Sequence, residues 1–294
     1  MRNVSAMPTV LDYKLARTYY DESGFYRPDK ARPLGDQGYG MFSPAYVCSN
    51  ECVSGIVQNL KPDGKTVLSI AGSGDVPFVL TAFGAKKVDT FDVSMHAELV
   101  MKIKMGMLQS DMSLLEYSGC LKSMQSQGLF CANAKVSSII QRSLSNSELE
   151  YLDGMYGVTV VRDIRKQKNW FPNTKQYILM KQKVITPYVF IRAGIDDVFD
   201  CIGDKKYDII YLSNILDYVV DDVMHESDET AIVGILERCT THLNKGGVIV
   251  VNSLMRPIRK YDIQLYLENI SKRVKHCGDM IYKKQIQTIF LNHR

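Results

Sequence analysis

The chain has 294 residues, of which 46% are hydrophobic and 23% charged, an ordinary composition for a globular protein of one large domain or one domain with a cap. The net charge of +4 is too small to indicate nucleic-acid binding by itself, and no apolar run of about 18 residues or more predicts a transmembrane segment. The seven cysteines show neither a CxxC pair nor a Cys/His metal spacing. We therefore expect reduced, buried thiols, no metal site and, because the N-terminus lacks an apolar h-region, a cytoplasmic location.

Residues 1–60 precede the first predicted sheet strand and contain six tyrosines. The first part of this segment is rich in turn residues, and its last part, near Val47 to Leu60, has a helical pattern. Such an extension could close over a ligand pocket as a lid or pack on the sheet as an aromatic strap, and tyrosines suit both arrangements. We interpret residues 1–60 as an N-terminal cap and leave the two arrangements open.

The segment from Val67 to Asp92, VLSIAGSGDVPFVLTAFGAKKVDTFD, predicts an apolar strand, a glycine turn, an amphipathic helix, a second strand and a terminal carboxylate. The turn is Gly72-Ser73-Gly74, and Asp92 follows Gly72 by 20 residues. In α/β sheets this layout holds an adenosine, because glycines let the backbone approach the ligand and the acid binds the ribose hydroxyls. GxG turns also occur where close packing alone requires small residues. The turn is therefore evidence for an adenosine site only together with Asp92.

The turn also indicates which adenosine compound is bound. A dinucleotide fingerprint needs a third glycine where Pro77 stands, and it presents a helix N-terminus to a pyrophosphate. Here Asp75 occupies that N-terminus, where its charge suits the helix dipole but repels a phosphate. A carboxylate at this place is better matched to a cation, such as the amino group and sulfonium of S-adenosylmethionine. The sequence therefore predicts an S-adenosylmethionine pocket.

A long insertion follows Asp92. Ser94 stands where it could cap a helix from Met95 to about Leu108. The next recognisable strand begins only near residue 188, and about 80 intervening residues exceed a normal connection in α/β units. We therefore predict a helical insertion at about residues 109–185 within a main domain of residues 61–294. The last part of this insertion, residues 162–183, is rich in basic side chains. We favour a solvated face for this segment, and a binding surface for a lipid headgroup or nucleic acid is the alternative.

The rest of the chain returns to alternating strands and helices. A strand at Tyr188–Arg192 leads to Ile195 and Asp196, where a strand end would meet an adenine. The later predicted elements are a strand at Asp208–Leu212, a helix at about Glu229–Leu243, a strand at Val248–Asn252 and a late, antiparallel strand at Gln285–Leu291. This pattern predicts an α/β fold, a Rossmann-like doubly wound and mostly parallel sheet, with its ligand at the carboxyl ends of the strands.

Three segments resemble a known family. VLSIAGSGD, VDTFDVS with the helix MKIKMGML, and YDIIYLSNILDYV are similar to the betaine-lipid synthases, which are S-adenosylmethionine:diacylglycerol 3-amino-3-carboxypropyl transferases. The GSG turn and apolar helix also resemble nicotianamine synthases, which move the same group. The resemblance spans roughly Gln58 to Asn252 and implies the class I methyltransferase fold. The Gln-x-Trp-Glu-Asp-like motif of the lipid synthases is replaced by FSPAY at residues 42–46, which speaks against a lipid acceptor and leaves the cofactor assignment in place.

The resemblance also implies roles for individual residues. It places the methionine part of the cofactor at Gly72, Ser73, Gly74 and Asp75, the ribose at Asp92, and the adenine at Ile195 and Asp196. Val93, next to Asp92, is a further expected cofactor-binding residue. It places the meeting point of cofactor and acceptor at Ser213, Asn214, Asp217 and Tyr218. Asp217 or Tyr218 would act as a base or hydrogen-bond acceptor toward an amine. Helix capping and aromatic packing are the alternative for these two residues.

These observations together predict an S-adenosylmethionine-dependent transferase. We favour transfer of the 3-amino-3-carboxypropyl group to a small-molecule nucleophile such as an amine, with release of methylthioadenosine. This preference comes from the resemblance, because residue spacing cannot decide which carbon is attacked. Three alternatives stay open. They are a methyltransferase, an acceptor-free enzyme that cleaves or cyclises S-adenosylmethionine, and a protein that binds the cofactor without turnover. A nicotinamide oxidoreductase is the least favoured, because of Asp75 and Pro77.

Overall fold

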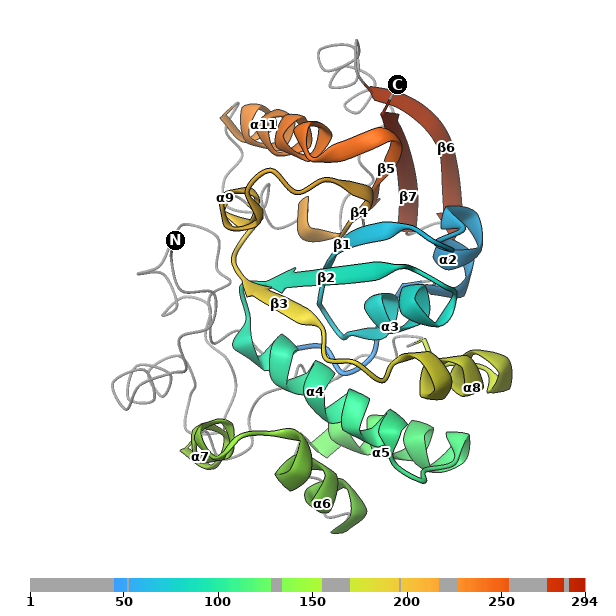
Figure 1. The fold of residues 1–294 in the computed structure, drawn as a ribbon, viewed down its shortest axis with the longest axis vertical. Coiled ribbons are helices and arrows are strands. Elements are labelled where there is room, and N and C mark those ends of the chain that lie inside the picture. Colours follow the sequence, from blue (N-terminus) through green and yellow to red (C-terminus); the bar gives the residue numbers. More distant parts are fainter. Residues whose placement is uncertain are drawn as a thin grey trace.

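A computed structural model gives the fold of the chain (Figure 1). The residues that it describes are 45–51, 53–127, 134–154, 170–195, 197–216, 227–253, 274–282 and 286–293. They form an α/β fold with one seven-stranded sheet. The strands are β1 Thr66–Ile70, β2 Lys87–Asp92, β3 Val189–Arg192, β4 Tyr207–Ser213, β5 Leu243–Ser253, β6 Val274–Tyr282 and β7 Ile286–His293.

The strand order is β3-β2-β1-β4-β5-β7-β6. The first five strands pair in parallel, and β7 is antiparallel to both of its neighbours, β5 and β6. This is the Rossmann-like, doubly wound and mostly parallel sheet that the sequence predicts, in the strand order of the class I methyltransferase fold. The order reverses between β1 and β4, and the crevice at such a switch point is where open α/β sheets bind ligands.

Both faces of the sheet are covered, and alternate residues of the central strands pack on opposite faces. Val67 and Tyr211 belong to one hydrophobic cluster, while Leu68 and Ile210 belong to the other. Because both faces are buried, β1 and β4 are continuous apolar runs, as expected for parallel strands. The first cluster packs under α2 Val53–Leu60, α3 Asp75–Ala82, α4 Met95–Gln109 and α8 Thr174–Lys183, and the second under α9 Val198–Ile202 and α11 Ser227–Thr241 (Figure 1).

The described residues between α4 and β3 are mostly helical. They form α5 Leu114–Gln127, α6 Ala134–Ser143 and α7 Asn146–Gly154 in addition to α8. The division of the chain into a cap and a main domain with an insertion stays a prediction. Ser94 does precede the first residue of α4, but its side chain makes no capping hydrogen bond. Its backbone N–H instead donates to Asp92, a contact that belongs to the site below.

Among the described strands, β6 is the one that sequence analysis missed. Its sequence, VKHCGDMIY, lacks regular alternation, because a glycine and an aspartate interrupt it. The ladder to β7 has a register shift between His276 and Gly278, which is typical of a bulge, and a bulge breaks the two-residue period on which strand prediction depends. Strand β7 is antiparallel, as predicted, at Ile286–His293.

Candidate functional site

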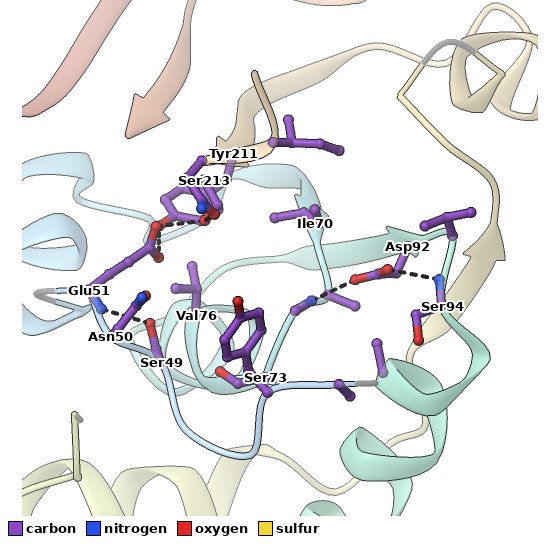
Figure 2. Close-up of a pocket in the computed structure, with 18 of the residues that line it drawn as sticks. Ser49, Asn50, Glu51, Ile70, Ser73, Val76, Asp92, Ser94, Tyr211 and Ser213 are labelled. Atoms are coloured by element: carbon purple, nitrogen blue, oxygen red, sulfur yellow. Dashed lines mark hydrogen bonds between the residues drawn. The ribbon is translucent and has the colours of Figure 1, made fainter. Parts of the chain in front are cut away.

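A pocket opens at the carboxyl ends of β1, β2 and β4, beside the switch point (Figure 2). Five segments that are far apart in the sequence line it, namely residues 45–51, the turn after β1, the end of β2 with the start of α4, residues 194–195, and the end of β4. Their lining residues are Ala45, Tyr46, Cys48, Ser49, Asn50, Glu51, Ile70, Ala71, Gly72, Ser73, Val76, Asp92, Val93, Ser94, Ala97, Gly194, Ile195, Tyr211, Ser213, Asn214 and Ile215.

The glycine turn serves two different purposes. Gly72 (φ 50°) and Gly74 (φ 79°) both lie in the left-handed region that favours glycine. Gly72 lines the pocket, and a Cβ added to it would meet no atom within 4 Å. A Cβ on Gly74 would lie 2.8 Å from Met101 Cγ and in contact with Phe78. Gly72 therefore leaves space for a ligand, whereas Gly74 is needed so that the turn can pack against α4.

Asp92 lies at the carboxyl end of β2 with its carboxylate held by the backbone. One oxygen accepts a hydrogen bond from the N–H of Gly72 (3.0 Å) and the other accepts one from the N–H of Ser94 (2.9 Å). Burial raises the pKa of Asp92 to about 6, although these backbone donors act in the opposite direction. Each carboxylate oxygen keeps acceptor capacity, and this arrangement suits a ligand with two neighbouring hydroxyl groups.

Asp75 is not among the residues that line the pocket, and its assignment to the cofactor stays a prediction. It is 1% exposed and forms an ion pair with Lys104, whose Nζ lies 2.5 Å from Oδ1. The other carboxylate oxygen accepts hydrogen bonds from the N–H of Ser49 and the hydroxyl of Ser73. In the structure the cation that contacts Asp75 is a lysine of the same chain, 29 residues away.

Lys104 connects the turn to the N-terminal segment. Its ammonium group is fully buried and donates to the carbonyl oxygens of Val47 (2.8 Å) and Ser73 (2.7 Å) as well as to Asp75. All three donors of the ammonium group are thus used, so this buried charge is satisfied within the protein. Nothing in the apolar and polar pattern of α4 marked Lys104 as buried, because its partners lie in other segments.

Glu51 is a charged pocket residue that sequence analysis missed. It is 6% exposed and lines the pocket. The hydroxyl of Ser213 donates to its carboxylate at 2.6 Å, and the hydroxyl of Tyr211 donates to the other oxygen. These partners lie about 160 residues further along the chain, at the end of β4. No local pattern around Glu51 could indicate this contact, since only the fold brings the two segments together.

The predicted site residues fall into three groups. The structure brings seven of them together around the pocket, namely Gly72, Ser73, Asp92, Val93, Ile195, Ser213 and Asn214. Gly74 and Asp75 lie behind the turn, as described above. Asp196, Asp217 and Tyr218 lie outside the described residues. The ligand contacts assigned to all of these residues stay predictions.

The described residues that line the pocket include two acids, Glu51 and Asp92, and no lysine, arginine or histidine. The pocket therefore favours hydrogen-bond donors and positive charge, and it disfavours phosphate. Cys48 also lines it, but burial and the nearby Asp75 raise the pKa of this thiol to about 12, so it is protonated at neutral pH and a poor nucleophile. Tyr46 is the one predicted lid tyrosine among the described residues, and it lines the pocket.

No group of three or more histidine, cysteine, aspartate or glutamate side chains among the described residues could hold a metal ion. No helix within them has the length and apolar character that a membrane crossing requires.

The chain is similar in structure to several solved proteins at low sequence identity. No protein-family model and no curated protein matches the chain. The rRNA methyltransferase aviRa from Streptomyces viridochromogenes has 13% identity and a TM-score of 0.44, with 98% of this chain and 96% of that chain covered. The N-methyltransferase NodS from Bradyrhizobium japonicum WM9, in complex with S-adenosyl-L-homocysteine, has 8% identity and a TM-score of 0.39, with 81% and 84% covered.

A third structure, SMU.776, described as a methyltransferase and complexed with SAH, has 8% identity and a TM-score of 0.42. The similarity covers 81% of this chain but only 48% of that one, so the chain spans about half of its length. Because identities and TM-scores are this low, the fold assignment rests on the strand order and not on these similarities.

Proposed function

We propose that this protein is an S-adenosylmethionine-dependent transferase. The observation that supports this best is the charge of the pocket at the switch point, where the described lining residues offer two carboxylates and no basic side chain. A matching ligand needs hydroxyl donors for Asp92 and positive charge elsewhere. S-adenosylmethionine has both, because it combines two ribose hydroxyls with an ammonium and a sulfonium group.

A phosphate-containing dinucleotide is a poor match for the same pocket. Pyrophosphates bind to the free N–H groups at the start of a helix. At the start of α3 the carboxylate of Asp75 is buried and saturated, and Lys104 behind it donates to protein oxygens. A phosphate bound there would lie close to the negatively charged carboxylate of Asp75, which is held in place by its partners. Two like charges close together in a buried site would destabilise the complex.

For the reaction, we propose transfer of the 3-amino-3-carboxypropyl group to a small-molecule nucleophile, with methylthioadenosine as the second product. Support comes from the resemblance of the turn and of the segment after β4 to enzymes that move this group. The group transferred depends on where the acceptor lies, because attack must be in line with the carbon–sulfur bond that breaks. Orientation at about 3–3.5 Å and exclusion of water are sufficient sources of acceleration for such a displacement.

Methyl transfer is the main alternative and would use the same cofactor contacts. It requires the acceptor to approach the methyl group instead of the carbon chain, and it yields S-adenosylhomocysteine. A protein that binds the cofactor without turnover, or that cleaves it without an acceptor, would also use the same contacts. These candidates differ in their products, so products and not binding distinguish them.

The first test is a calorimetric titration of the purified protein with S-adenosylmethionine and, for comparison, NAD⁺. We expect S-adenosylmethionine to bind and NAD⁺ not to bind. Tight binding of NAD⁺ without binding of S-adenosylmethionine would contradict the proposal, because it would show that the acidic pocket accepts a pyrophosphate.

The second test is mass spectrometry of the nucleoside formed from S-adenosylmethionine in the presence of a cell extract. Methylthioadenosine with a matching gain of mass on an acceptor is expected. Formation of S-adenosylhomocysteine would show that the reaction is methyl transfer and not aminocarboxypropyl transfer. Binding without either product would support a binding protein.

A further inference from the structure

Ser49 and Asn50 lie in the wall of the pocket across from Asp92 (Figure 2). Ser73 and Val76 are drawn between this wall and Asp92, on the turn and on α3. If Asp92 binds the ribose, a ligand that extends past the turn reaches Ser49 and Asn50 with its non-nucleoside part. The cofactor contacts predicted from the sequence include neither residue.

Ser49 is fixed by three hydrogen bonds and keeps one unused donor. Its N–H donates to the carboxylate of Asp75 at 2.8 Å, and its carbonyl oxygen accepts from the N–H of Trp170 at 2.7 Å. Its hydroxyl oxygen accepts from the N–H of Glu51 at 3.1 Å. The residue is 8% exposed, and among the described residues no acceptor receives its hydroxyl proton. A buried donor of this kind is costly until a ligand or a water molecule supplies an acceptor.

Asn50 adds further donors beside Ser49. Its side chain lines the pocket and makes no hydrogen bond within the described part of the chain. The amide nitrogen carries two N–H groups, so the two neighbouring side chains together offer one O–H and two N–H donors. None of these donors carries a charge, and all of them belong to a segment that other parts of the fold hold in place.

Neutral donors at this end of the pocket are matched to a carboxylate. The described lining residues include no lysine, arginine or histidine, so among them only neutral donors can bind a negatively charged group. S-adenosylmethionine has one such group, the carboxylate of its methionine part. Hydrogen bonds to a charged acceptor are roughly twice as strong as those between neutral groups, so several such bonds can offset the cost of burying a carboxylate.

We propose that Ser49 and Asn50 bind the carboxylate of S-adenosylmethionine and thereby select it over its decarboxylated form, an inference that rests on the proposed transferase function. The decarboxylated compound keeps the nucleoside, the sulfonium and the ammonium group and lacks only the carboxylate. When it is bound, the buried hydroxyl of Ser49 loses the acceptor that the complete cofactor provides. A site whose buried donors stay unpaired discriminates strongly against such an analogue.

The same contact has a consequence for the group that is transferred. The carboxylate belongs to the 3-amino-3-carboxypropyl group, so Ser49 and Asn50 hold the far end of the carbon chain whose bond to sulfur breaks. A chain that is held at both ends has a fixed direction relative to this bond, and a displacement depends on such orientation. Both residues are positioning residues and take no part in the bond changes.

Contact with the acceptor is the competing role for Asn50. The two roles differ in what a substitution changes. If Asn50 binds the cofactor carboxylate, its loss weakens the binding of S-adenosylmethionine and not that of the decarboxylated form. If it contacts the acceptor, both affinities stay as they are in the wild type.

The experiment is a calorimetric titration of the wild type, Asn50→Ala and Asn50→Asp with S-adenosylmethionine and with decarboxylated S-adenosylmethionine. We expect the wild type to bind the complete cofactor at least about tenfold more tightly than the decarboxylated form. Asn50→Ala should lose about tenfold in affinity for S-adenosylmethionine and keep its affinity for the decarboxylated form within about twofold. Asn50→Asp should reverse the preference, because its carboxylate repels that of the cofactor and attracts the ammonium group.

Two further variants serve as control and as second test. Asn146→Ala makes the same change at an exposed residue at the start of α7, and it should bind both ligands as the wild type does. Ser49→Ala removes the hydroxyl and should show the same selective loss for S-adenosylmethionine. Because this hydroxyl also accepts a hydrogen bond from the N–H of Glu51, urea unfolding must first show that Ser49→Ala is folded.

The opposite outcomes contradict different statements. Equal binding of the two ligands by the wild type, or the same ratio of their affinities in the wild type and Asn50→Ala, overturns the carboxylate site and leaves the transferase function in place. A preference for S-adenosylmethionine that persists in Asn50→Asp also overturns the site. Failure of the wild type to bind either ligand contradicts the proposed function itself.

Discussion

Asp92 is an acid whose charge state changes in an accessible pH range. In the free protein burial raises its pKa to about 6, well above the ordinary value of 3.8. Ribose hydroxyls that donate to the carboxylate favour the charged form, so ligand binding should lower this pKa and release a proton below pH 6. We predict that S-adenosylmethionine affinity is constant from pH 7 to 8 and falls by up to about tenfold per pH unit below 6.

Calorimetry between pH 5 and 8, in buffers of different ionisation heat, measures both the affinity and the protons released. Asp92→Asn is the control, since the amide keeps the size of the side chain and cannot titrate; its weaker affinity should not change over this range. An affinity of the wild type that is independent of pH would exclude Asp92 as the ribose ligand.

The buried ion pair of Lys104 and Asp75 is expected to contribute strongly to the stability of the fold. Removal of the cation in Lys104→Met leaves a buried carboxylate uncompensated, and we predict a loss of about 3–5 kcal/mol in the free energy of unfolding. The measurement is urea unfolding. Lys135→Met, which removes the ammonium of an exposed pair with Glu116, should change the stability little. Addition of Asp75→Asn to Lys104→Met should recover part of the loss; no recovery would mean that packing, not charge, explains the effect.

At the scale of elements, the sequence predicted what depends on local pattern. The alternation of β1, α3 and β2 and the spacing from Gly72 to Asp92 are contained in one contiguous segment, and both are found where predicted. Glu51 and the partner of Asp75 depend on contacts between distant segments, which a single sequence does not contain. Asp217 and Tyr218 lie outside the described residues, so their roles remain predictions.

The two glycines of the turn offer a matched pair of substitutions. Both have positive φ, so an alanine at either position is strained by a similar amount, about 1–2 kcal/mol. At Gly72 the new methyl enters the open pocket, whereas at Gly74 it meets Met101. We predict that Gly72→Ala lowers S-adenosylmethionine affinity more than stability, and that Gly74→Ala lowers stability by a further amount of about 1–3 kcal/mol from overpacking.

Calorimetric titration and urea unfolding of the two variants measure both effects. The same change of stability in both variants, with equal loss of affinity, would mean that the turn acts as one rigid unit and that the pocket side of Gly72 has no special role.

For the whole molecule, residues 45–51 join parts of the fold that otherwise lie apart. Val47 and Ser49 are hydrogen bonded to the Lys104–Asp75 pair, and the N–H of Trp170, at the start of the region that leads to α8, donates to the carbonyl of Ser49 at 2.7 Å. Glu51 contacts the end of β4. One short segment therefore connects the turn, α4, the residues before α8 and the strand beyond the switch point, and it forms one wall of the pocket.

This arrangement makes the segment a reporter of ligand binding. Amide exchange requires local opening, and a ligand that binds only the closed form adds RT ln(1 + [L]/Kd) to the opening free energy, about 2.7 kcal/mol at 100 times Kd. We predict that S-adenosylmethionine at this level slows exchange up to about 100-fold in residues 45–51 as well as in residues 71–75, and leaves α6 unchanged. Hydrogen–deuterium exchange with mass spectrometry measures all three regions at once. Slowing confined to residues 71–75 would contradict this prediction and would show that the cofactor is bound without residues 45–51.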